Sequence, residues 1–318
     1  MATIIIFGGS GFIGTHLSHK LISDDYNVII IDLNKPRFSH EQLTYIKCDV
    51  RDLSKLDINV PIERIYNFAA VHTTPGHPTH EYYDTNIAGA SSVCELAEKH
   101  DVNEIIFTSS ISVYGPDEEQ KDENTELTPN SAYGYSKMLA EKIHKSWYKS
   151  RDNRKLTIVR PAVVFGPGEG GNFTRLATMM GKGIFIYPGR KNTIKACIYV
   201  EDLISAIESA RYTDNSFELF NGAYPERYTL ENIIECFKKN HFPNVKLFMV
   251  PKQVVLCAAS LFKIVNFLNI GIHPDRVMKL IRSTNIYPSW IVENEIQLPG
   301  DLESALQRWS DSTNGRFD

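Results

Sequence analysis

The sequence is poor in cysteine and lacks the patterns that cysteine chemistry needs. No Cys-x-x-Cys pair occurs, and the five cysteines are widely spaced, at Cys48, Cys94, Cys197, Cys236 and Cys257. An odd number of scattered cysteines excludes a regular disulfide framework, so we interpret them as reduced core residues of a cytoplasmic protein.

Long apolar runs and an excess of positive charge are also lacking. No stretch of about 18 uncharged apolar residues occurs, so no integral membrane segment is expected. The start, MATIIIFGG, has no basic region before its apolar run, and we expect a buried strand there rather than a signal peptide. The net charge of −4 and the pI near 6.2 give no reason to expect a nucleic-acid partner.

Short β-branched runs alternate with helical patterns through the first half of the chain. The runs cover residues 3–7, 27–32, 43–47, 64–70, 104–110 and 156–162, and the helices cover 11–24, 80–100 and 131–150. Runs that are apolar on both faces are typical of parallel strands joined by helical crossovers. The pattern predicts an α/β fold with a Rossmann-type, doubly wound parallel sheet.

The order is looser after Pro167, and we place a domain boundary there. Helices are expected near 173–182, 201–211, 229–240 and 301–309, and strands near 194–199, 217–221 and 245–250. Residues 1–167 should form the Rossmann domain. Residues 168–318 should form mainly a smaller α/β substrate-binding region, with some segments returning to the main sheet.

A glycine-rich turn follows the first strand directly and leads into a helix, in Gly8-Gly9-Ser10-Gly11-Phe12-Ile13-Gly14. Glycine lets the backbone approach a pyrophosphate at a helix N-terminus, where unpaired N–H groups face the ligand. The order of strand, turn and helix therefore favours a dinucleotide site over a turn that needs glycine only for its backbone shape. The expected contacts from this turn are Gly8, Gly11, Phe12, Ile13 and Gly14.

Asp32 closes the second strand, where a carboxylate can accept both ribose hydroxyls of an adenosine. A 2′-phosphate there would meet its negative charge, so NAD is favoured over NADP, although Lys35 and Arg37 lie nearby. Asp49 and Val50, after the third strand, are placed to meet the adenine ring. A capped turn is the alternative for that pair.

Tyr133 and Lys137, in the sequence YGYSK, are four residues apart and share one face of a helix. A free tyrosine has a pKa near 10, so acting as a base at neutral pH requires a shift of about 3 units, or roughly 4 kcal/mol. A fixed ammonium and a positive nicotinamide ring can supply that. Taken alone, this stretch would be an ordinary surface helix.

Together these motifs resemble the extended short-chain dehydrogenase/reductase family, the sugar-nucleotide epimerases and dehydratases. The matching elements are the glycines, Asp32, NFAA at 67–70, Asn86, SSISVYG, YGYSK and RPAVVFGPG at 160–168. The resemblance implies that Tyr133 is the general acid/base, that Lys137 fixes the ribose and lowers the tyrosine pKa, and that Ser110 assists beside the reacting carbon. It implies further cofactor contacts from Phe68, Ala69 and Ala70. The family needs no metal, and we set aside a metal site at His72, His77 and His80.

A missing carboxylate narrows the reaction. The 4,6-dehydratases of this family carry an Asp-Glu pair just before VYG, and decarboxylating members carry a Glu, whereas Ile111 and Ser112 stand here. Elimination is disfavoured, so we predict an NAD-dependent sugar-nucleotide epimerase that acts at C4 through a 4-keto intermediate. A 4-keto-sugar-nucleotide reductase or dehydrogenase would use the same residues, and a noncatalytic NAD-binding scaffold or sensor is a third reading.

Substrate contacts are expected in the second half of the chain. Asn172 opens a helix that could hold a diphosphate, and Lys195 replaces the arginine usual in the family, without its bidentate fork. Arg276 and Arg282 are candidates for the second phosphate by charge alone. These departures leave the nucleotide open.

Three further segments carry expectations about partners. Related proteins dimerise through helices that correspond to residues 80–100 and 131–150, so a homodimer is expected. Residues 250–270 are unusually apolar and are read as a core or dimer-facing helix, with a membrane-surface or partner helix as the alternative. The acidic run 117–126 is expected to be a solvated loop beside the site.

Overall fold

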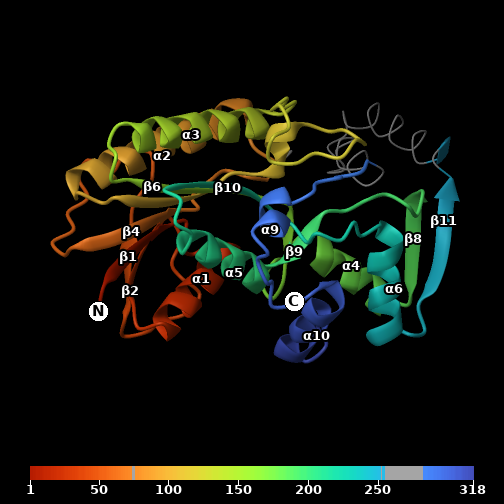
Figure 1. The fold of residues 1–318 in the computed structure, drawn as a ribbon. Coiled ribbons are helices and arrows are strands. Elements are labelled where there is room, and N and C mark those ends of the chain that lie inside the picture. Colours follow the sequence, from red (N-terminus) through yellow and green to blue (C-terminus); the bar gives the residue numbers. More distant parts are fainter. Residues whose placement is uncertain (74–75, 252, 255–281) are drawn as a thin grey trace.

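The computed structural model describes residues 1–73, 76–251, 253–254 and 282–318. Its main layer is a seven-stranded sheet in the order β10-β6-β5-β4-β1-β2-β3, with parallel pairing throughout (Figure 1). The strands are β1 (Thr3–Phe7), β2 (Asn27–Asp32), β3 (Leu43–Lys47), β4 (Ile62–Asn67), β5 (Glu104–Thr108), β6 (Lys155–Pro161) and β10 (Phe217–Gly222). From β1 the chain adds β2 and β3 on one side, and β4, β5, β6 and β10 then follow on the other side of β1, as in a doubly wound fold. The predicted fold class is confirmed.

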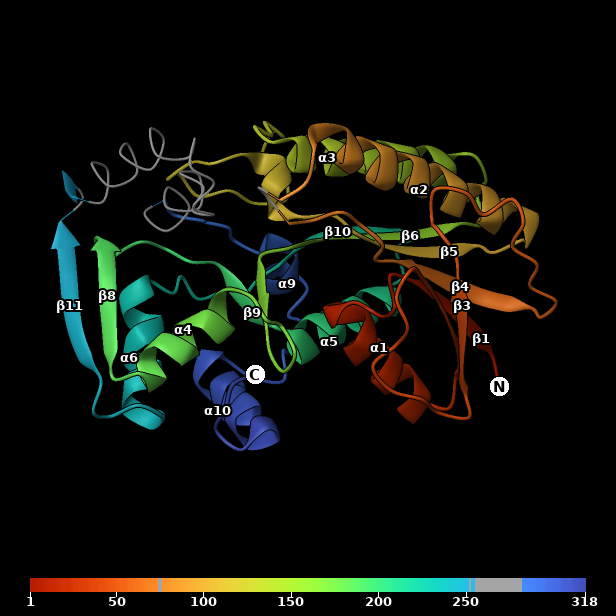
Figure 2. The ribbon, with the colours of Figure 1, turned by 180° about the vertical axis from the view of Figure 1, so that it is seen from behind.

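Helices cover both faces of this sheet. α2 (Thr79–Lys99) and α3 (Ala132–Lys149) lie side by side on one face, and α1 (Phe12–Ser23) and α5 (Val200–Arg211) lie on the other (Figures 1 and 2). The strand sequences explain this arrangement, because β1 is buried at every position and its side chains alternate between two apolar layers. None of the described helices is long and apolar enough to cross a membrane.

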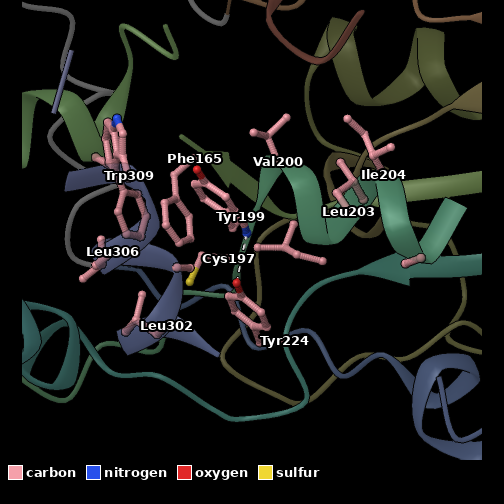
Figure 3. Close-up of a cluster of buried hydrophobic side chains, with 14 of the residues drawn as sticks. Phe165, Cys197, Tyr199, Val200, Leu203, Ile204, Tyr224, Leu302, Leu306 and Trp309 are labelled. Atoms are coloured by element: carbon pink, nitrogen blue, oxygen red, sulfur yellow. Dashed lines mark hydrogen bonds between the residues drawn. The ribbon is translucent and has the colours of Figure 1, made fainter. Parts of the chain in front are cut away.

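The second half of the chain adds smaller elements beyond the carboxyl ends of the strands. These are α4 (Asn172–Gly181), α6 (Leu230–Asn240), α9 (Ser289–Glu293), α10 (Leu302–Thr313), and two small parallel sheets that pair β7 (Val163–Phe165) with β9 (Cys197–Tyr199) and β8 (Ile184–Gly189) with β11 (Lys246–Pro251). Their core is continuous with the apolar layer under α1 and α5. Figure 3 shows Phe165, Tyr199 and Trp309 meeting where this core joins α5.

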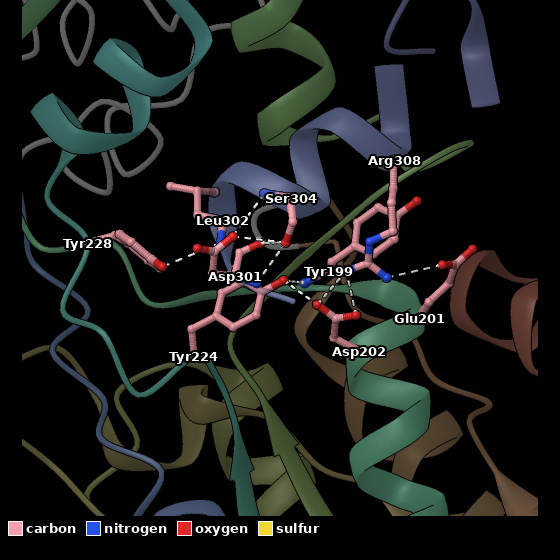
Figure 4. A network of polar contacts seen from close by, with 9 residues as sticks. All are labelled: Tyr199, Glu201, Asp202, Tyr224, Tyr228, Asp301, Leu302, Ser304 and Arg308. Carbon is pink, nitrogen blue, oxygen red and sulfur yellow. Dashed lines mark hydrogen bonds and ion pairs between the residues drawn. The ribbon is translucent and has the colours of Figure 1, made fainter. Parts of the chain in front are cut away.

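A polar network fastens α10 to α5 (Figure 4). Arg308 of α10 donates from Nη2 to both carboxylate oxygens of Asp202, at 2.7 and 2.8 Å, and the Tyr224 hydroxyl donates to the same carboxylate at 2.6 Å. Burial raises the pKa of Asp202, and these bonds act in the opposite direction. A capping box between Asp301 and Ser304 fixes the start of α10. These contacts hold α10 to α5, the helix that packs on the main sheet.

The structure corrects the expectation for the acidic run 117–126. Glu118 is paired with Arg190 at 2.5 Å, and Glu123 accepts hydrogen bonds from the N–H groups of Asn221 and Ser289 at 2.8 and 3.0 Å. The run therefore connects distant segments through an ion pair and hydrogen bonds, and it is not only a solvated loop. Its carboxylates satisfy backbone N–H groups that would otherwise lack a partner in a partly buried position.

Several boundaries also differ from the expected ones. The strands expected at 64–70 and 104–110 end earlier, at Asn67 and Thr108, because the chain leaves the sheet there to build the site. β8 and α9 have no counterpart among the sequence expectations. Arg276 and almost all of residues 250–270 lie outside the described residues, so the expectations for them stay predictions.

Candidate active site

The glycine turn lies between β1 and α1. Gly8 has a φ of +73°, and a Cβ there would lie 2.7 Å from the backbone nitrogen of Ala69. A Cβ on Gly14 would lie 2.6 Å from the carbonyl oxygen of Gly8. These neighbours are backbone atoms, so both positions require glycine. Gly11 is the N-cap of α1, and glycine has no side chain that could accept a hydrogen bond from the first N–H groups of the helix. These N–H groups therefore suit a pyrophosphate.

Asp32 ends β2 beside this turn. Its Oδ2 accepts a hydrogen bond from the Ser10 N–H at 3.1 Å, and its Oδ1 accepts one from the Asn34 N–H at 2.9 Å. The carboxylate is thus held at the carboxyl edge of the sheet. Arg37 points elsewhere, because its Nη1 donates to the carbonyl oxygen of Gly168 at 3.3 Å.

The other expected cofactor residues lie at the same edge of the sheet. The Phe68 N–H donates to the Phe7 carbonyl at 2.9 Å, so residues 68–70 leave β4 next to the glycine turn. Val50 is 8% exposed and packs against α2, where a Cβ on Gly89 would lie 2.9 Å from it. Asp49 is engaged by Arg51 at 2.6 Å, and this hydrogen bond lowers the pKa of Asp49.

Residues 108–114, which are rich in side-chain hydroxyls, form a tight turn at the end of β5. Ser110 is 9% exposed, and its Oγ accepts the Ser112 N–H at 3.1 Å, which caps a 3-10 helix, η1 (Ile111–Tyr114). Thr108 donates to the Asn67 carbonyl at 3.4 Å, and Ser109 donates to Glu141 at 2.6 Å. Thr108 is therefore bonded to the backbone of β4, and Ser109 to a side chain of α3.

The helix α3 begins directly against this turn, and Gly134 makes the close approach possible. A Cβ on Gly134 would lie 2.5 Å from the carbonyl oxygen of Ser112. Tyr133, one residue earlier, is half-buried, and its hydroxyl faces Ser110. Burial raises the pKa of Tyr133 to about 12, and the interaction with Ser110 acts in the opposite direction.

Lys137 lies one helical turn after Tyr133 and is 2% exposed. Its Nζ donates to the Thr108 carbonyl at 2.7 Å and lies 4.8 Å from the centre of the Phe107 ring. Burial lowers the pKa of Lys137 to about 7, and the carboxylate of Glu141 opposes this. The structure thus brings Tyr133, Lys137 and Ser110 together where β5 meets α3.

Buried residues behind this group were not predicted to be functional. Asn86 of α2 donates from Nδ2 to the Ser136 hydroxyl at 2.8 Å, and Ser136 donates to the Tyr133 carbonyl at 2.8 Å, which fixes the start of α3. Glu141 and Arg160 form a buried ion pair at 2.7 Å. The sequence did offer signals, because Asn86 and Arg160 belong to the elements that resemble the family and Glu141 lies four residues after Lys137.

The expected substrate residues have other described partners. Asn172 is exposed at the start of α4, where the Glu169 carboxylate already accepts hydrogen bonds from the Thr174 N–H and hydroxyl at 3.0 and 2.9 Å. Lys195 donates from Nζ to the Arg282 carbonyl at 2.7 Å, and burial lowers its pKa to about 8. No described contact joins either residue to Tyr133, so their role in substrate binding stays a prediction.

The histidines of the loop after β4 have partners of other kinds. His77 Nδ1 lies 2.8 Å from Glu81, and burial lowers the pKa of His72. Among the residues that the structure describes, no three His, Cys, Asp or Glu side chains are grouped so that they could hold a metal ion.

Comparison with known proteins finds a matching family model and similar proteins that are named as epimerases. The model of the NAD dependent epimerase/dehydratase family matches residues 4–220. The N-acetyl-alpha-D-glucosaminyl-diphospho-ditrans,octacis-undecaprenol 4-epimerase of Escherichia coli O157:H7 is 28% identical over 96% of this chain and 93% of its own length. The UDP-glucose 4-epimerase of Lactobacillus helveticus is 26% identical over 79% of this chain and 85% of its own length.

Solved structures show the same fold. The UDP-glucose 4-epimerase of Thermotoga maritima, solved with UDP-glucose, superposes with a TM-score of 0.76 at 20% identity, over 99% of this chain and 100% of its own. The family match covers more than half of the chain and includes the glycine turn, Ser110, Tyr133 and Lys137. The chain therefore belongs to the NAD-dependent epimerase/dehydratase family, which confirms the family and the NAD cofactor predicted from its sequence.

Proposed function

We propose that this chain is a 4-epimerase that inverts C4 of a diphosphate-linked sugar, in the first place a sugar nucleotide. The observation that carries the proposal is that Tyr133, Lys137 and Ser110 lie together where β5 meets α3. Such a set can move a proton and support hydride transfer. The 4-epimerase names of the relatives support the same chemistry.

In this reaction Tyr133 takes the proton of the C4 hydroxyl and later returns a proton to the C4 oxygen, while Ser110 holds that oxygen by a hydrogen bond. Bound NAD, held by the glycine turn and Asp32, would supply the hydride acceptor and donor that this inversion of C4 through a 4-keto sugar needs. Lys137 binds the cofactor ribose, and its charge favours the Tyr133 phenolate. The oxidation state of the sugar does not change, so the cofactor should remain bound.

The pKa of Tyr133 decides when this residue can act as a base. Burial raises it to about 12, so the hydroxyl is protonated at neutral pH. A protonated Lys137 and the positive nicotinamide ring of oxidised NAD are the charges that would favour the phenolate. We infer that Tyr133 becomes a base only in the complex with oxidised cofactor.

We propose residues 1–167 as the NAD-binding domain and residues 168–318 as mainly the substrate domain. The proposed cofactor contacts are Gly8, Gly11, Phe12, Ile13, Gly14, Asp32, Asp49, Val50, Phe68, Ala69, Ala70, Tyr133 and Lys137. The proposed substrate contacts are Ser110, Asn172 and Lys195. The glycine turn and the ends of β2 and β5 share one edge of the sheet, which supports the cofactor set.

Replacing Asp32 by asparagine should weaken the preference for NAD. The substitution keeps an oxygen for the Ser10 or Asn34 N–H but removes the charge that favours ribose hydroxyls and repels a 2′-phosphate. We expect NAD affinity to fall by about tenfold, the worth of one hydrogen bond to a charged group, and NADP affinity to rise. Calorimetry with both cofactors measures this. Tighter binding of NADP than of NAD by the unaltered protein would contradict the role given to Asp32.

A sugar carried on a lipid diphosphate is the second candidate substrate. The relative that matches almost the whole chain is named for an undecaprenol-linked sugar. The outer face of β8 and β11 supports this reading, because Ile184, Ile186 and Phe248 are 49%, 44% and 53% exposed there. Segments 182–189 and 244–251 contain two lysines and no acidic residue, which suits an anionic diphosphate or lipid.

A cytoplasmic homodimer is the proposed assembly. The side-by-side packing of α2 and α3 supports it, because two such pairs can form a four-helix interface between copies. The cysteines Cys48, Cys94, Cys197 and Cys236 carry free thiols, in keeping with a reducing compartment.

The test of the function is to incubate the protein with UDP-glucose, UDP-N-acetylglucosamine and N-acetylglucosaminyl diphosphoundecaprenol, and to follow C4 by NMR. We expect the C4 epimer of at least one of them, with no net NADH formed or used and no 4,6-dehydrated product, because Ile111 and Ser112 supply no acid. Stoichiometric NADH consumption would favour the reductase reading. An ultraviolet signal of 4-keto-6-deoxy sugar in alkali would overturn the argument from the missing carboxylate.

A further inference from the structure

A buried ion pair lies directly behind the proposed acid/base group. Glu141 is on α3, four residues after Lys137, and Arg160 is on β6. Arg160 donates from Nε to Oε1 of Glu141 at 2.8 Å and from Nη2 to Oε2 at 2.7 Å, and the two side chains are 3% and 1% exposed. Two charges taken out of water are tolerated because this geometry satisfies both carboxylate oxygens.

The pair also holds both ends of the turn that carries Ser110. Ser109 donates its hydroxyl to Oε1 of Glu141 at 2.6 Å. At the other end, Arg160 donates from Nη1 to the Tyr114 hydroxyl at 2.8 Å. Ser109, two residues before η1, is therefore fixed to α3, and Tyr114, the last residue of η1, is fixed to β6, with Ser110 between these two attachment points.

Glu141 is also the acidic neighbour of Lys137. The spacing of four residues puts both on one face of α3, and the Glu141 carboxylate opposes the effect of burial on the pKa of Lys137. Besides Tyr133, the titratable groups that face Lys137 include His144 of α3 and His72 of the loop after β4. Burial lowers the pKa of both histidines, to about 4 for His144, so neither supplies a positive charge at neutral pH.

Two more cations face Glu141 and not Lys137 directly. These are Arg160 of β6 and Lys145 of α3, whose Nζ lies 3.7 Å from the carboxylate. The strand β5 contributes the Thr108 carbonyl, which accepts from Lys137, and the uncharged ring of Phe107 at 4.8 Å. Among the described neighbours, the Glu141 carboxylate is therefore the group whose charge favours a protonated Lys137.

We propose that Glu141, held by Arg160, is a positioning residue that keeps Lys137 charged and keeps the Ser110 turn aligned with Tyr133. The proposal rests on the proposed role of Lys137 at the cofactor ribose. Glu141 itself touches neither Tyr133 nor Ser110 in any described contact, so its effect is exerted through Lys137 and through Ser109.

The test measures NADH affinity against pH by fluorescence, which needs no substrate. In the unaltered protein, affinity should fall as pH rises and Lys137 loses its proton, because a charged donor binds the ribose hydroxyls more strongly. In Glu141→Gln the midpoint of that fall should move to lower pH. If the midpoint moved down by one pH unit, the fraction of Lys137 that is protonated at a pH above both midpoints would be about ten times smaller.

Matched variants separate charge from packing. Glu104→Gln removes the carboxylate of another largely buried pair, in which Arg211 donates from Nε at 2.8 Å, at the far end of β5. We expect this control to leave the midpoint unmoved. Glu141→Asp keeps the charge and should retain a midpoint near that of the unaltered protein. Equal midpoints for the unaltered protein and Glu141→Gln would overturn the proposal.

Two more variants complete the test. Ser109→Ala keeps the carboxylate but cuts its bond to the turn, so turnover of an accepted sugar should fall about tenfold with the midpoint unmoved. Unchanged turnover would overturn the alignment of Ser110, even if Glu141→Gln failed to fold. Lys137→Met should abolish the fall in affinity with pH. If NADH affinity still fell with pH in Lys137→Met, the role of Lys137 at the ribose would be wrong, and the proposal would fail with it. If the fall vanished in Lys137→Met but its midpoint stayed unmoved in Glu141→Gln, only the proposal about Glu141 would fail.

Discussion

Replacing Tyr133 by phenylalanine should lower turnover by about 10²–10⁴ while leaving the fold intact, since that is the usual worth of a positioned proton-transfer group. Phenylalanine keeps the ring, whose centre lies 6.3 Å from that of Tyr82, and loses only the hydroxyl that faces Ser110. The measurement is the rate of C4 inversion, with the thermal midpoint and NADH affinity recorded alongside. Both should remain close to those of the unaltered protein.

Tyr135 provides the matched control for this variant. It lies on the same helix two residues later and is 44% exposed, so Tyr135→Phe removes a hydroxyl from α3 without touching Ser110. We expect its turnover to be unchanged. Ser110→Ala should cost less than Tyr133→Phe, because water can partly replace one hydroxyl. Near-normal turnover in Tyr133→Phe would show that the chemistry is not carried by this helix.

The sequence predicted those parts of the site that depend on near neighbours in the chain. The glycine turn is one, since Gly8 and Gly14 are required by contacts within a single strand-turn-helix unit and with Ala69. The spacing of Tyr133 and Lys137 is another, because helical geometry alone puts residues four apart on one face. The alternation of apolar runs with helices likewise predicted the sheet, because strands buried on both faces have few other arrangements.

Contacts between distant segments could not be predicted in the same way. Arg160 belongs to a family motif, but only the pairing of β5 with β6 brings it under Glu141. Likewise, nothing in the sequence indicated that the Nζ of Lys195 donates to the carbonyl of Arg282, 87 residues later in the chain.

Burial is the second property that residue spacing does not give. The sequence predicts that Lys137 lowers the pKa of Tyr133, but in the structure burial is the largest influence and the pKa rises to about 12. Burial also brings the pKa of Lys137 itself down to about 7. The lowering that catalysis needs therefore depends on the charge added by oxidised NAD, and it stays a prediction.

Replacing Gly14 by alanine should disrupt both stability and cofactor binding. The added Cβ would lie 2.6 Å from the Gly8 carbonyl oxygen and 2.6 Å from the Gly9 Cα, and neither backbone atom can move without displacing the turn. Overpacking of this kind typically costs about 1–3 kcal/mol of unfolding free energy. Moving the start of α1 away from the pyrophosphate should lower NAD affinity by about 10–100-fold, the worth of a hydrogen bond to a charged group.

Gly181 is the matched control for this second variant, because it ends α4 and a Cβ there would meet only the Phe242 ring at 3.7 Å. Alanine at that helical position should raise the unfolding free energy by up to about 1 kcal/mol and leave NAD binding unchanged. Urea unfolding and calorimetry with NAD measure the two effects separately. If Gly14→Ala lowered stability but bound NAD normally, the glycine would serve only the packing of α1 on β1, and the pyrophosphate would have to be held by other groups than the start of that helix.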